Sequence, residues 1–165
     1  MEDYRIITLH DNKLKVFRNG IIQREFVYKY GSRDGKYKKR DIKWVEIGSL
    51  HKLTGYYRIK LNTKFYLIHR VMGYAFLGLD IDNPTQIIDH IDRNKTNNNV
   101  VNLRIVTKQQ NEWNTNSKGY CWDKRINKYQ VRICLNNKNI SLGCYKTEAC
   151  AKLAYLTAKA HYHQF

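Results

Sequence analysis

The chain has 165 residues, enough for one domain or for two or three small modules. Lysine and arginine number 30 against 14 acidic residues, so the formal net charge is +16 and the pI is about 9.8. This surplus disfavours cationic partners and favours polyanions, through phosphate neutralisation and counterion release. A hydrophobic content of 42% with 13% aromatic residues excludes a disordered basic tail, so the chain is expected to fold.

Residues 1–65 are predicted to form a β meander, because β-forming residues alternate or cluster in three segments around an Asn19-Gly20 turn. These segments are Tyr4–Leu9, Leu14–Arg18 and Ile21–Tyr28. A basic loop, GSRDGKYKKRDIK, is expected next, and its positive residues are Lys36, Lys38, Lys39 and Arg40. Taken alone, such a run favours a solvated loop. Beside the central motif, contact of Lys38, Lys39 and Arg40 with nucleic-acid phosphates is an equal alternative.

The central region is predicted to contain a hairpin, a helix and a strand–strand–helix unit. In chain order the segments are Gly55–Leu61 with Lys64–Ile68, then His69–Leu77, then Ile87–Ile91, Leu103–Val106 and Lys108–Asn114. The stretch DHIDRNKTNNNVVNLRIVTKQQN spans the last unit, from Asp89 to Asn111. This order can bring Asn111 back beside Asp89.

The chemistry of this stretch points to phosphodiester hydrolysis with one metal ion. A neutral imidazole at His90 can take a proton from water near pH 7. The Asp89 carboxylate and the Asn111 amide oxygen are hard ligands that suit one magnesium or manganese ion. Asn102 can brace the polar loop between the two strands through backbone hydrogen bonds.

Several assignments in this stretch stay open. The chain holds 16 asparagines, so two of them at set distances from a histidine are a weak signal alone. Neighbours on a regular strand point to opposite faces, so Asp89 and His90 share a site only if the backbone is irregular. The remaining polar residues have alternatives: Asn97, Asn98 and Asn99 as loop formers, Asp92 as a turn residue or a support for a ligand, and His69 as a packing residue or a phosphate contact.

Residues 55–116 resemble the HNH endonuclease family, specifically its phage intron-encoded homing branch. The matching segments are GYYRIKL, HRVMGYAFLG and the stretch from Asp89 to Asn111. The resemblance implies a ββα-metal fold in which Asp89 and Asn111 bind the metal, His90 activates water and Asn102 is the structural middle asparagine. The last motif position is asparagine, as in the branch that nicks one strand, which disfavours zinc-type ligation.

Residues 117–165 are predicted to form a three-stranded sheet packed on one helix. The strands are expected at Gly119–Trp122, Tyr129–Leu135 and Asn139–Tyr145, with an Asn136-Asn137 turn between the last two. Thr147 is predicted to cap the helix, and its face toward the sheet is expected to carry Ala149, Leu153, Leu156 and Ala160. The four cysteines of this region lack a C-x-x-C pair and are expected to be reduced and buried: Cys121, Cys134, Cys144 and Cys150.

Residues 117–161 are similar to the plant ethylene-response-factor DNA-binding domain, through Gly119, Trp122, the K-Y-x-V-x-I strand, Leu142-Gly143 and an alanine-rich helix. The resemblance implies a sheet laid in the major groove of DNA. On its outward face, Arg132 is predicted to read guanine and Gln130 adenine. The full predicted contact set is Trp122, Lys124, Arg125, Lys128, Gln130, Arg132, Asn139 and Ser141. A merely solvated basic face is the alternative.

These patterns together predict an α+β chain with three regions: an N-terminal β meander (1–54), a central HNH ββα-metal nuclease motif (55–116) and a C-terminal three-stranded sheet packed on one helix (117–165). The expected function is metal-dependent, site-specific nicking of double-stranded DNA by a monomer, with one magnesium or manganese ion per active site and no obligate protein partner. No signal peptide or membrane span is evident, which favours an intracellular protein, and the resemblance to the homing branch implies a phage, virus or mobile element as its source. A non-catalytic DNA-binding regulator is the main alternative, and RNA binding is the third.

Overall fold

The computed structural model describes residues 3–31, 37–136 and 138–163, and the side chains of residues 29–31 and 37–40 lie outside this description. By contacts, the chain divides into two compact units, Met1–Ile105 and Val106–Phe165. The mixed α+β class predicted from the sequence is confirmed. Within the described residues, no helix is both long and apolar enough to cross a membrane.

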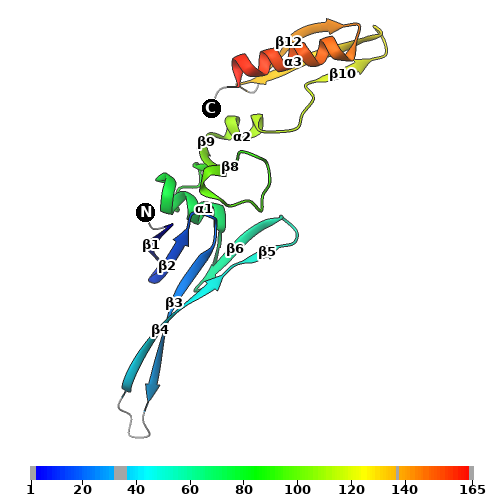
Figure 1. Cartoon of the computed structure of the whole chain (residues 1–165). Helices are drawn as coiled ribbons and strands as arrows, with labels where there is room; N and C mark the ends of the chain where they lie inside the picture. Colours follow the sequence, from blue (N-terminus) through cyan, green and yellow to red (C-terminus); the bar gives the residue numbers. More distant parts are fainter. Residues whose placement is uncertain (1–2, 32–36, 137, 164–165) are drawn as a thin grey trace. The chain divides into compact units, whose positions relative to one another are not determined.

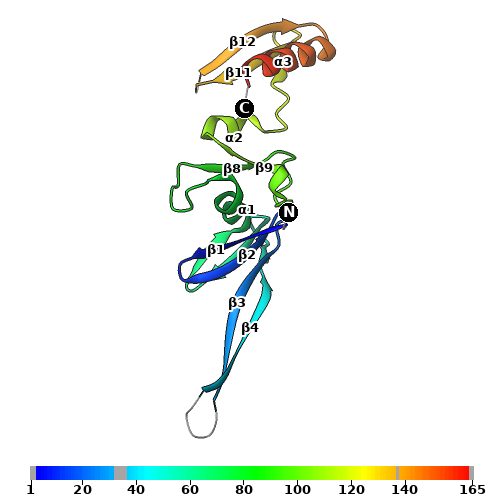
Figure 2. The same ribbon diagram turned by 60° about the vertical axis from the view of Figure 1, so that its left-hand side comes forward.

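Unit 1 opens with a four-stranded antiparallel sheet in the order β1-β2-β3-β4, which confirms the predicted meander. Its strands are β1 (Tyr4–Leu9), β2 (Asn12–Phe17), β3 (Ile22–Gly31) and β4 (Tyr37–Ile47). Strands β3 and β4 extend as a long hairpin away from the rest of the unit (Figures 1 and 2).

The prediction of a basic loop over the whole segment from residue 31 to residue 43 is wrong. Lys38, Lys39 and Arg40 belong to β4, where Lys39 pairs with Tyr30 and Arg40 with Lys29. Pairing with β3, with a register shift between Tyr30 and Gly31, supplies backbone hydrogen bonds that outweigh the low strand propensity of lysine. Lys36 lies outside the described residues, and so do the side chains of the three other basic residues.

The rest of unit 1 follows the predicted order of hairpin, helix and paired strands. A three-stranded sheet contains β5 (Ser49–His51), β6 (Tyr56–Leu61) and β7 (Lys64–Leu67). Helix α1 (Ile68–Met72) continues as one π-helical turn, Gly73–Leu77. A two-stranded sheet then pairs β8 (Ile87–His90) with β9 (Leu103–Val106), and a 3-10 turn at Val100–Asn102 leads into β9.

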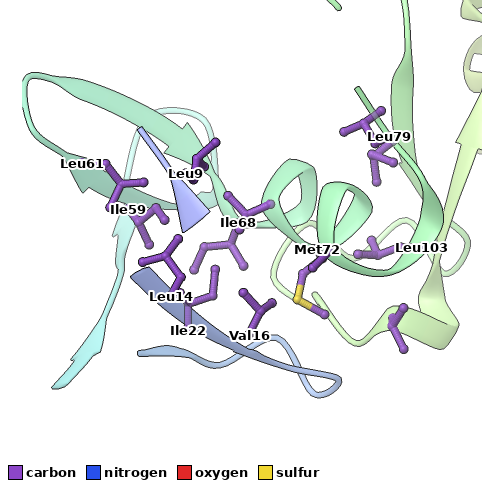
Figure 3. Close-up of a cluster of buried hydrophobic side chains, with 14 residues drawn as sticks. Leu9, Leu14, Val16, Ile22, Ile59, Leu61, Ile68, Met72, Leu79 and Leu103 are labelled. Carbon is purple, nitrogen blue, oxygen red and sulfur yellow. The ribbon is translucent and has the colours of Figure 1, made fainter. Parts of the chain in front are cut away.

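One hydrophobic core joins the N-terminal sheet to the central region. Leu14 and Ile22 from the first sheet meet Ile59 from β6 and Met72 from α1, and all four are buried (Figure 3). Leu103, at the start of β9, belongs to the same cluster. The predicted boundary between residues 54 and 55 therefore does not separate two cores.

Unit 2 contains a short helix and the predicted sheet with its covering helix. Its elements are α2 (Lys108–Trp113), β10 (Tyr120–Asp123), β11 (Lys128–Leu135), β12 (Lys138–Tyr145) and α3 (Glu148–Tyr162). The sheet is antiparallel in the order β10-β11-β12. The Thr147 side chain accepts a hydrogen bond from the backbone N–H of Cys150, which confirms the predicted helix cap. In the predicted turn, Asn136 has a left-handed φ of 50°, whereas Asn137 lies outside the described residues.

The predicted sheet-facing side of α3 is wrong. The buried residues are Ala151, Tyr155 and Ala158, which pack on Val131 and Ile133 of β11. The predicted set starts two positions earlier, about 200° away round a helix of about 100° per residue. Its four members, Ala149, Leu153, Leu156 and Ala160, are all exposed. Two small alanines allow a close approach to the sheet that the bulkier leucines would prevent.

The cysteine prediction is also wrong in part. The four cysteines are free, but each of them is exposed rather than buried: Cys121, Cys134, Cys144 and Cys150. Strand alternation explains three of them, because they occupy sheet positions on the side away from α3. The fourth lies in the first turn of α3, outside its buried face.

Gly119 allows the close packing of unit 2, and its replacement by alanine should destabilise this unit. A Cβ at Gly119 would overlap the ring of Tyr155, and φ is +70°. Steric overlap and left-handed strain should together lower the free energy of unfolding by about 3 kcal/mol. Gly78 is the matched control, because φ is +78° and nothing lies within 4 Å. Gly78→Ala should cost only about 1 kcal/mol. Urea denaturation measures both, and equal losses would contradict the steric argument.

Candidate active site

The two residues predicted for chemistry lie at the end of β8, and both are buried. Asp89 is 6% exposed and His90 is 5% exposed. The backbone N–H of the next residue, Ile91, donates to the carbonyl oxygen of Asn102 at 2.9 Å. The loop between β8 and β9 is thereby closed directly beside the Asp-His pair.

Asp89 is held by an arginine that the sequence analysis did not single out. Arg104 on β9 donates from Nε at 3.0 Å and from Nη2 at 2.8 Å, both to Oδ2 of Asp89. The pair is mostly shielded from water, since the side chains are 24% and 7% exposed. A buried carboxylate needs a cationic or hydrogen-bonding partner. The two N–H groups of Arg104 on Oδ2 fix the orientation of the Asp89 carboxylate.

His90 is oriented by Asn98, which was expected only to form the loop. The His90 Nε2 atom lies 3.3 Å from the Asn98 amide oxygen, while the Asn98 amide nitrogen donates to the carbonyl of Thr96. With its oxygen toward the ring, Asn98 favours the tautomer that carries hydrogen on Nε2 and the lone pair on Nδ1. Burial lowers the pKa of His90, although Asn98 and the nearby Asp92 and Asp89 act to raise it. The imidazole is therefore neutral near pH 7.

His69 lies beside His90 as a buried, uncharged packing residue. Their rings meet edge to face at 5.1 Å, and the Tyr56 ring lies 4.9 Å from His69 and 5.9 Å from His90. Burial lowers the pKa of His69 to about 3, with smaller contributions from His90 and Arg70. A side chain that is 6% exposed fits the packing alternative better than a surface phosphate contact.

His69 should make the stability of unit 1 depend on pH. Between about pH 6.5 and pH 3 the unfolded chain binds a proton at His69 that the folded chain does not. The free energy of unfolding should therefore fall as the pH falls, by up to about 1.4 kcal/mol per pH unit. His69→Phe should flatten this slope in urea denaturation between about pH 7 and about pH 4.5, whereas the exposed control His161→Phe should keep it. Equal slopes for His69→Phe and the wild type would contradict the assignment.

Asn102 makes its predicted kind of contact, by bonding across the loop. Its amide oxygen accepts from the backbone N–H of Asp92 at 3.0 Å. Its amide nitrogen donates to Oδ1 of Asp92 and to the carbonyl of Asn97, each at 2.9 Å. Asp92 also accepts from the Asn97 side chain and the Asn94 backbone, and these bonds lower its pKa. Asp92 is thus a turn residue that organises the loop.

Asn111 lies on α2 in unit 2, whereas Asp89 and His90 lie in unit 1. Its helix is well defined, because Thr107 and Gln110 form a reciprocal capping box at the N-terminus. Its pairing with Asp89 around a metal stays a prediction. One carboxylate and one amide oxygen fit a hard divalent cation by their chemistry. Among the described residues, no group of three or more His, Cys, Asp and Glu side chains could hold a metal ion.

The strand register separates the predicted DNA-contacting residues of unit 2 into two faces. Gln130 pairs with Cys144 and Arg132 with Ser141, while Val131 between them is buried against α3. The side facing away from α3 therefore carries Gln130, Arg132, Asn139 and Ser141, as expected. Trp122 pairs with Tyr129 and packs on its ring at 4.8 Å, on the other side. Lys124 and Arg125 are exposed in the β10–β11 turn, and Lys128 begins β11.

Comparison with known proteins finds a family match for the central region. Residues 66–113 match the family model described as HNH endonuclease. A protein of Bacillus subtilis (strain 168), whose name assigns it to the SPbeta prophage and to the HNH homing endonucleases (YosQ), is 41% identical over 61 residues. This alignment covers 37% of the chain and 34% of that protein, so the chain matches about a third of the length of this relative.

A solved structure is similar over a longer stretch but at lower identity. It is described as DNA binding and cleavage by the HNH homing endonuclease I-HmuI, and the match covers 97% of this chain and 91% of that one. The sequence identity is 21% and the TM-score is 0.43, which does not establish a common fold. The family match spans the helix, both paired strands, the Asp-His pair and Asn111. Residues 66–113, which hold these elements, are thus the part of the chain that is similar to HNH endonucleases.

Proposed function

We propose that the chain is a metal-dependent, site-specific DNA endonuclease of the homing type, which nicks one strand by a one-metal mechanism. The observation that carries the proposal is the state of His90. Within a segment that matches the HNH endonuclease model, this histidine is buried, neutral near pH 7 and oriented by Asn98. Such an imidazole is suited to accept a proton from water.

In the proposed mechanism, the Nδ1 atom of His90 accepts a proton from the attacking water. Asn98 fixes the ring by binding Nε2, and His69 packs against it. Asp89, anchored by Arg104, and Asn111 are the proposed metal ligands. When bound, a magnesium or manganese ion supplies charge stabilisation for the scissile phosphate and its leaving oxygen. Asn102 keeps the loop between β8 and β9 in shape.

Double-stranded DNA is the proposed substrate. The net charge of +16 favours binding to phosphates, and the outward face of the C-terminal sheet carries polar side chains that suit contact with base edges in the major groove. Lys38, Lys39 and Arg40, in the long β3–β4 hairpin, are proposed to bind phosphates at a second place. We also propose that unit 2 binds DNA in the way its similarity to the ethylene-response-factor domain implies, with its sheet in the major groove.

The proposed enzyme acts as a monomer and comes from a mobile element. One active site with one metal cuts one strand per binding event, which favours nicking unless the protein dimerises. The relative whose name assigns it to a prophage supports an origin in a phage or a mobile element.

A plasmid assay tests the proposal. With magnesium or manganese, supercoiled plasmid should become open-circular, and little linear product should form at early times. EDTA should stop the reaction. Binding to DNA without cleavage across several divalent metals would overturn the proposal in favour of a non-catalytic DNA-binding regulator.

A further inference from the structure

The outward face of the C-terminal sheet carries a chain of hydrogen bonds that begins at an acidic residue. Asp123, at the end of β10, accepts from Arg125 Nε at 3.3 Å and from Arg125 Nη2 at 3.0 Å. It also accepts from Gln130 Nε2 at 2.7 Å. Gln130 Oε1 in turn accepts from Arg132 Nη2 at 2.9 Å. The chain thus runs from Arg125 through Asp123 and Gln130 to Arg132.

The partners fix the orientation of the Gln130 amide. A carboxylate can only accept and a guanidinium can only donate, so Nε2 must face Asp123 and Oε1 must face Arg132. Reading adenine would require the same two amide atoms, with Oε1 accepting from N6 and Nε2 donating to N7. Because Asp123 and Arg132 hold these two atoms, Gln130 cannot turn its amide toward adenine without breaking both contacts, so the adenine contact expected from the sequence is disfavoured.

Asp123 is likewise occupied. Its Oδ1 accepts from the backbone N–H and Nε of Arg125, and its Oδ2 accepts from Arg125 Nη2 and Gln130 Nε2. Its side chain is only 11% exposed in this pocket of donors, whereas that of Arg125 is 86% exposed. A carboxylate with this many donors has little capacity left for a base edge.

Of the four residues linked by these hydrogen bonds, Arg132 is the one that can reach a base of DNA. One of its N–H groups binds Gln130, and the guanidinium has others for a paired contact. Its neighbours on this face are small and exposed: Cys121, Cys134, Ser141 and Cys144. Arg132 is itself exposed, its guanidinium is held by Gln130, and it also lines a pocket with Glu112 and Trp113 of α2.

We propose that Arg132 reads a guanine in the major groove of DNA, and that Asp123 and Gln130 are positioning residues that hold its guanidinium and contact no base. The inference rests on the proposed function, because it takes double-stranded DNA as the substrate. Bidentate binding of arginine to O6 and N7 is the commonest specific contact in this groove, which is wide enough for strands. The deep, narrow major groove of double-stranded RNA would not admit them.

Selection from DNA duplexes with a randomised centre tests this assignment. The full chain is used in EDTA, so that the result does not depend on cleavage. The wild type should enrich guanine at one position. Arg132→Ala should reduce this discrimination roughly 5- to 150-fold. Gln130→Met should weaken it at the same position, by roughly threefold or more, without changing the preference elsewhere. Loss of an adenine preference at another position, with guanine retained, would overturn the assignment.

Asp123→Asn separates positioning from general structural support. It should lower the guanine preference and raise affinity for unselected duplexes, because a negative charge near the phosphates is removed. Simple loosening of unit 2 would lower both quantities and would overturn a positioning role. Lys124→Gln is the matched control: it should weaken binding to all duplexes alike, lower the salt slope by about one and keep the guanine preference.

The outcomes distinguish this inference from the proposed function. A wild-type chain that nicks plasmid but shows no guanine preference dependent on Arg132 would overturn the inference alone. A chain that shows this preference but never nicks would overturn the proposed function alone. Failure to bind any duplex would overturn the inference whatever the plasmid assay shows.

Discussion

Replacing His90 with alanine is expected to lower the rate of strand nicking by about 10²- to 10⁴-fold while leaving affinity for DNA nearly unchanged. The imidazole is the proposed acceptor of the proton from water, and its loss removes general-base catalysis. Its ring is buried among His69, Tyr56 and Asn98, so alanine also leaves a small cavity in unit 1. The rate should be measured from single-turnover conversion of supercoiled plasmid, and binding from gel mobility in EDTA.

Two controls separate chemistry from folding in that experiment. His161→Ala changes an exposed histidine on α3 and should leave nicking at the wild-type rate. Asn98→Ala keeps the imidazole but removes the contact that favours its tautomer. Asn98→Ala should therefore lower the rate less than His90→Ala. Nicking at the wild-type rate by the His90→Ala chain would refute the mechanism.

Replacing Asp89 with asparagine is expected to slow nicking by roughly 10²-fold or more and to raise the metal concentration needed for half-maximal rate. The change removes the only charged ligand of the proposed metal site but keeps the size of the side chain. The appropriate measurement is the nicking rate as a function of magnesium and manganese concentration. An unchanged metal dependence would show that Asp89 is not a ligand.

The ion pair with Arg104 complicates this variant, so a second one is needed. Asp89→Asn leaves a largely buried guanidinium without its anionic partner, which can itself destabilise unit 1. Arg104→Lys disturbs the pair from the other side, because it keeps a positive charge but loses the two-point contact. If metal ligation is the main role of Asp89, Arg104→Lys should keep most of the metal-dependent rate. Urea denaturation of both variants measures their stability.

The elements of the site were predictable from sequence because local signals for them agree. The strands at Ile87–His90 and Leu103–Val106 begin and end within one residue of the prediction, and α2 begins at the expected residue. Alternation and capping are local properties of the chain. The residues that contact Asp89 and His90 were not predictable in this way. Arg104 and Asn98 act across a hairpin and a loop, and nothing in their own surroundings in the sequence marks them among many basic and asparagine residues.

The wrong face of α3 shows a second limit. Alanine, leucine and tyrosine occur all round this helix, so the apolar pattern allows more than one buried side. The choice is made by shape, since Tyr155 fits the space beside Gly119, which no periodicity reveals. The β4 half of the long β3–β4 hairpin was not predicted from the sequence, for a related reason. Its lysines look like a loop until the partner strand that pairs with them is known.

The core shared by the N-terminal sheet and the central region has an evolutionary consequence. Leu14 and Ile22 cannot be separated from Ile59 and Met72 without exposing the interior of both parts. The segment that matches the family model is therefore not a cassette that recombination could move alone. A gene fusion that keeps the nuclease motif but lacks roughly the first fifty residues would expose the hydrophobic side chains of this core to water. Exchange after α2, which ends at Trp113, would leave that core intact and would carry both proposed metal ligands, Asp89 and Asn111, to a new binding module.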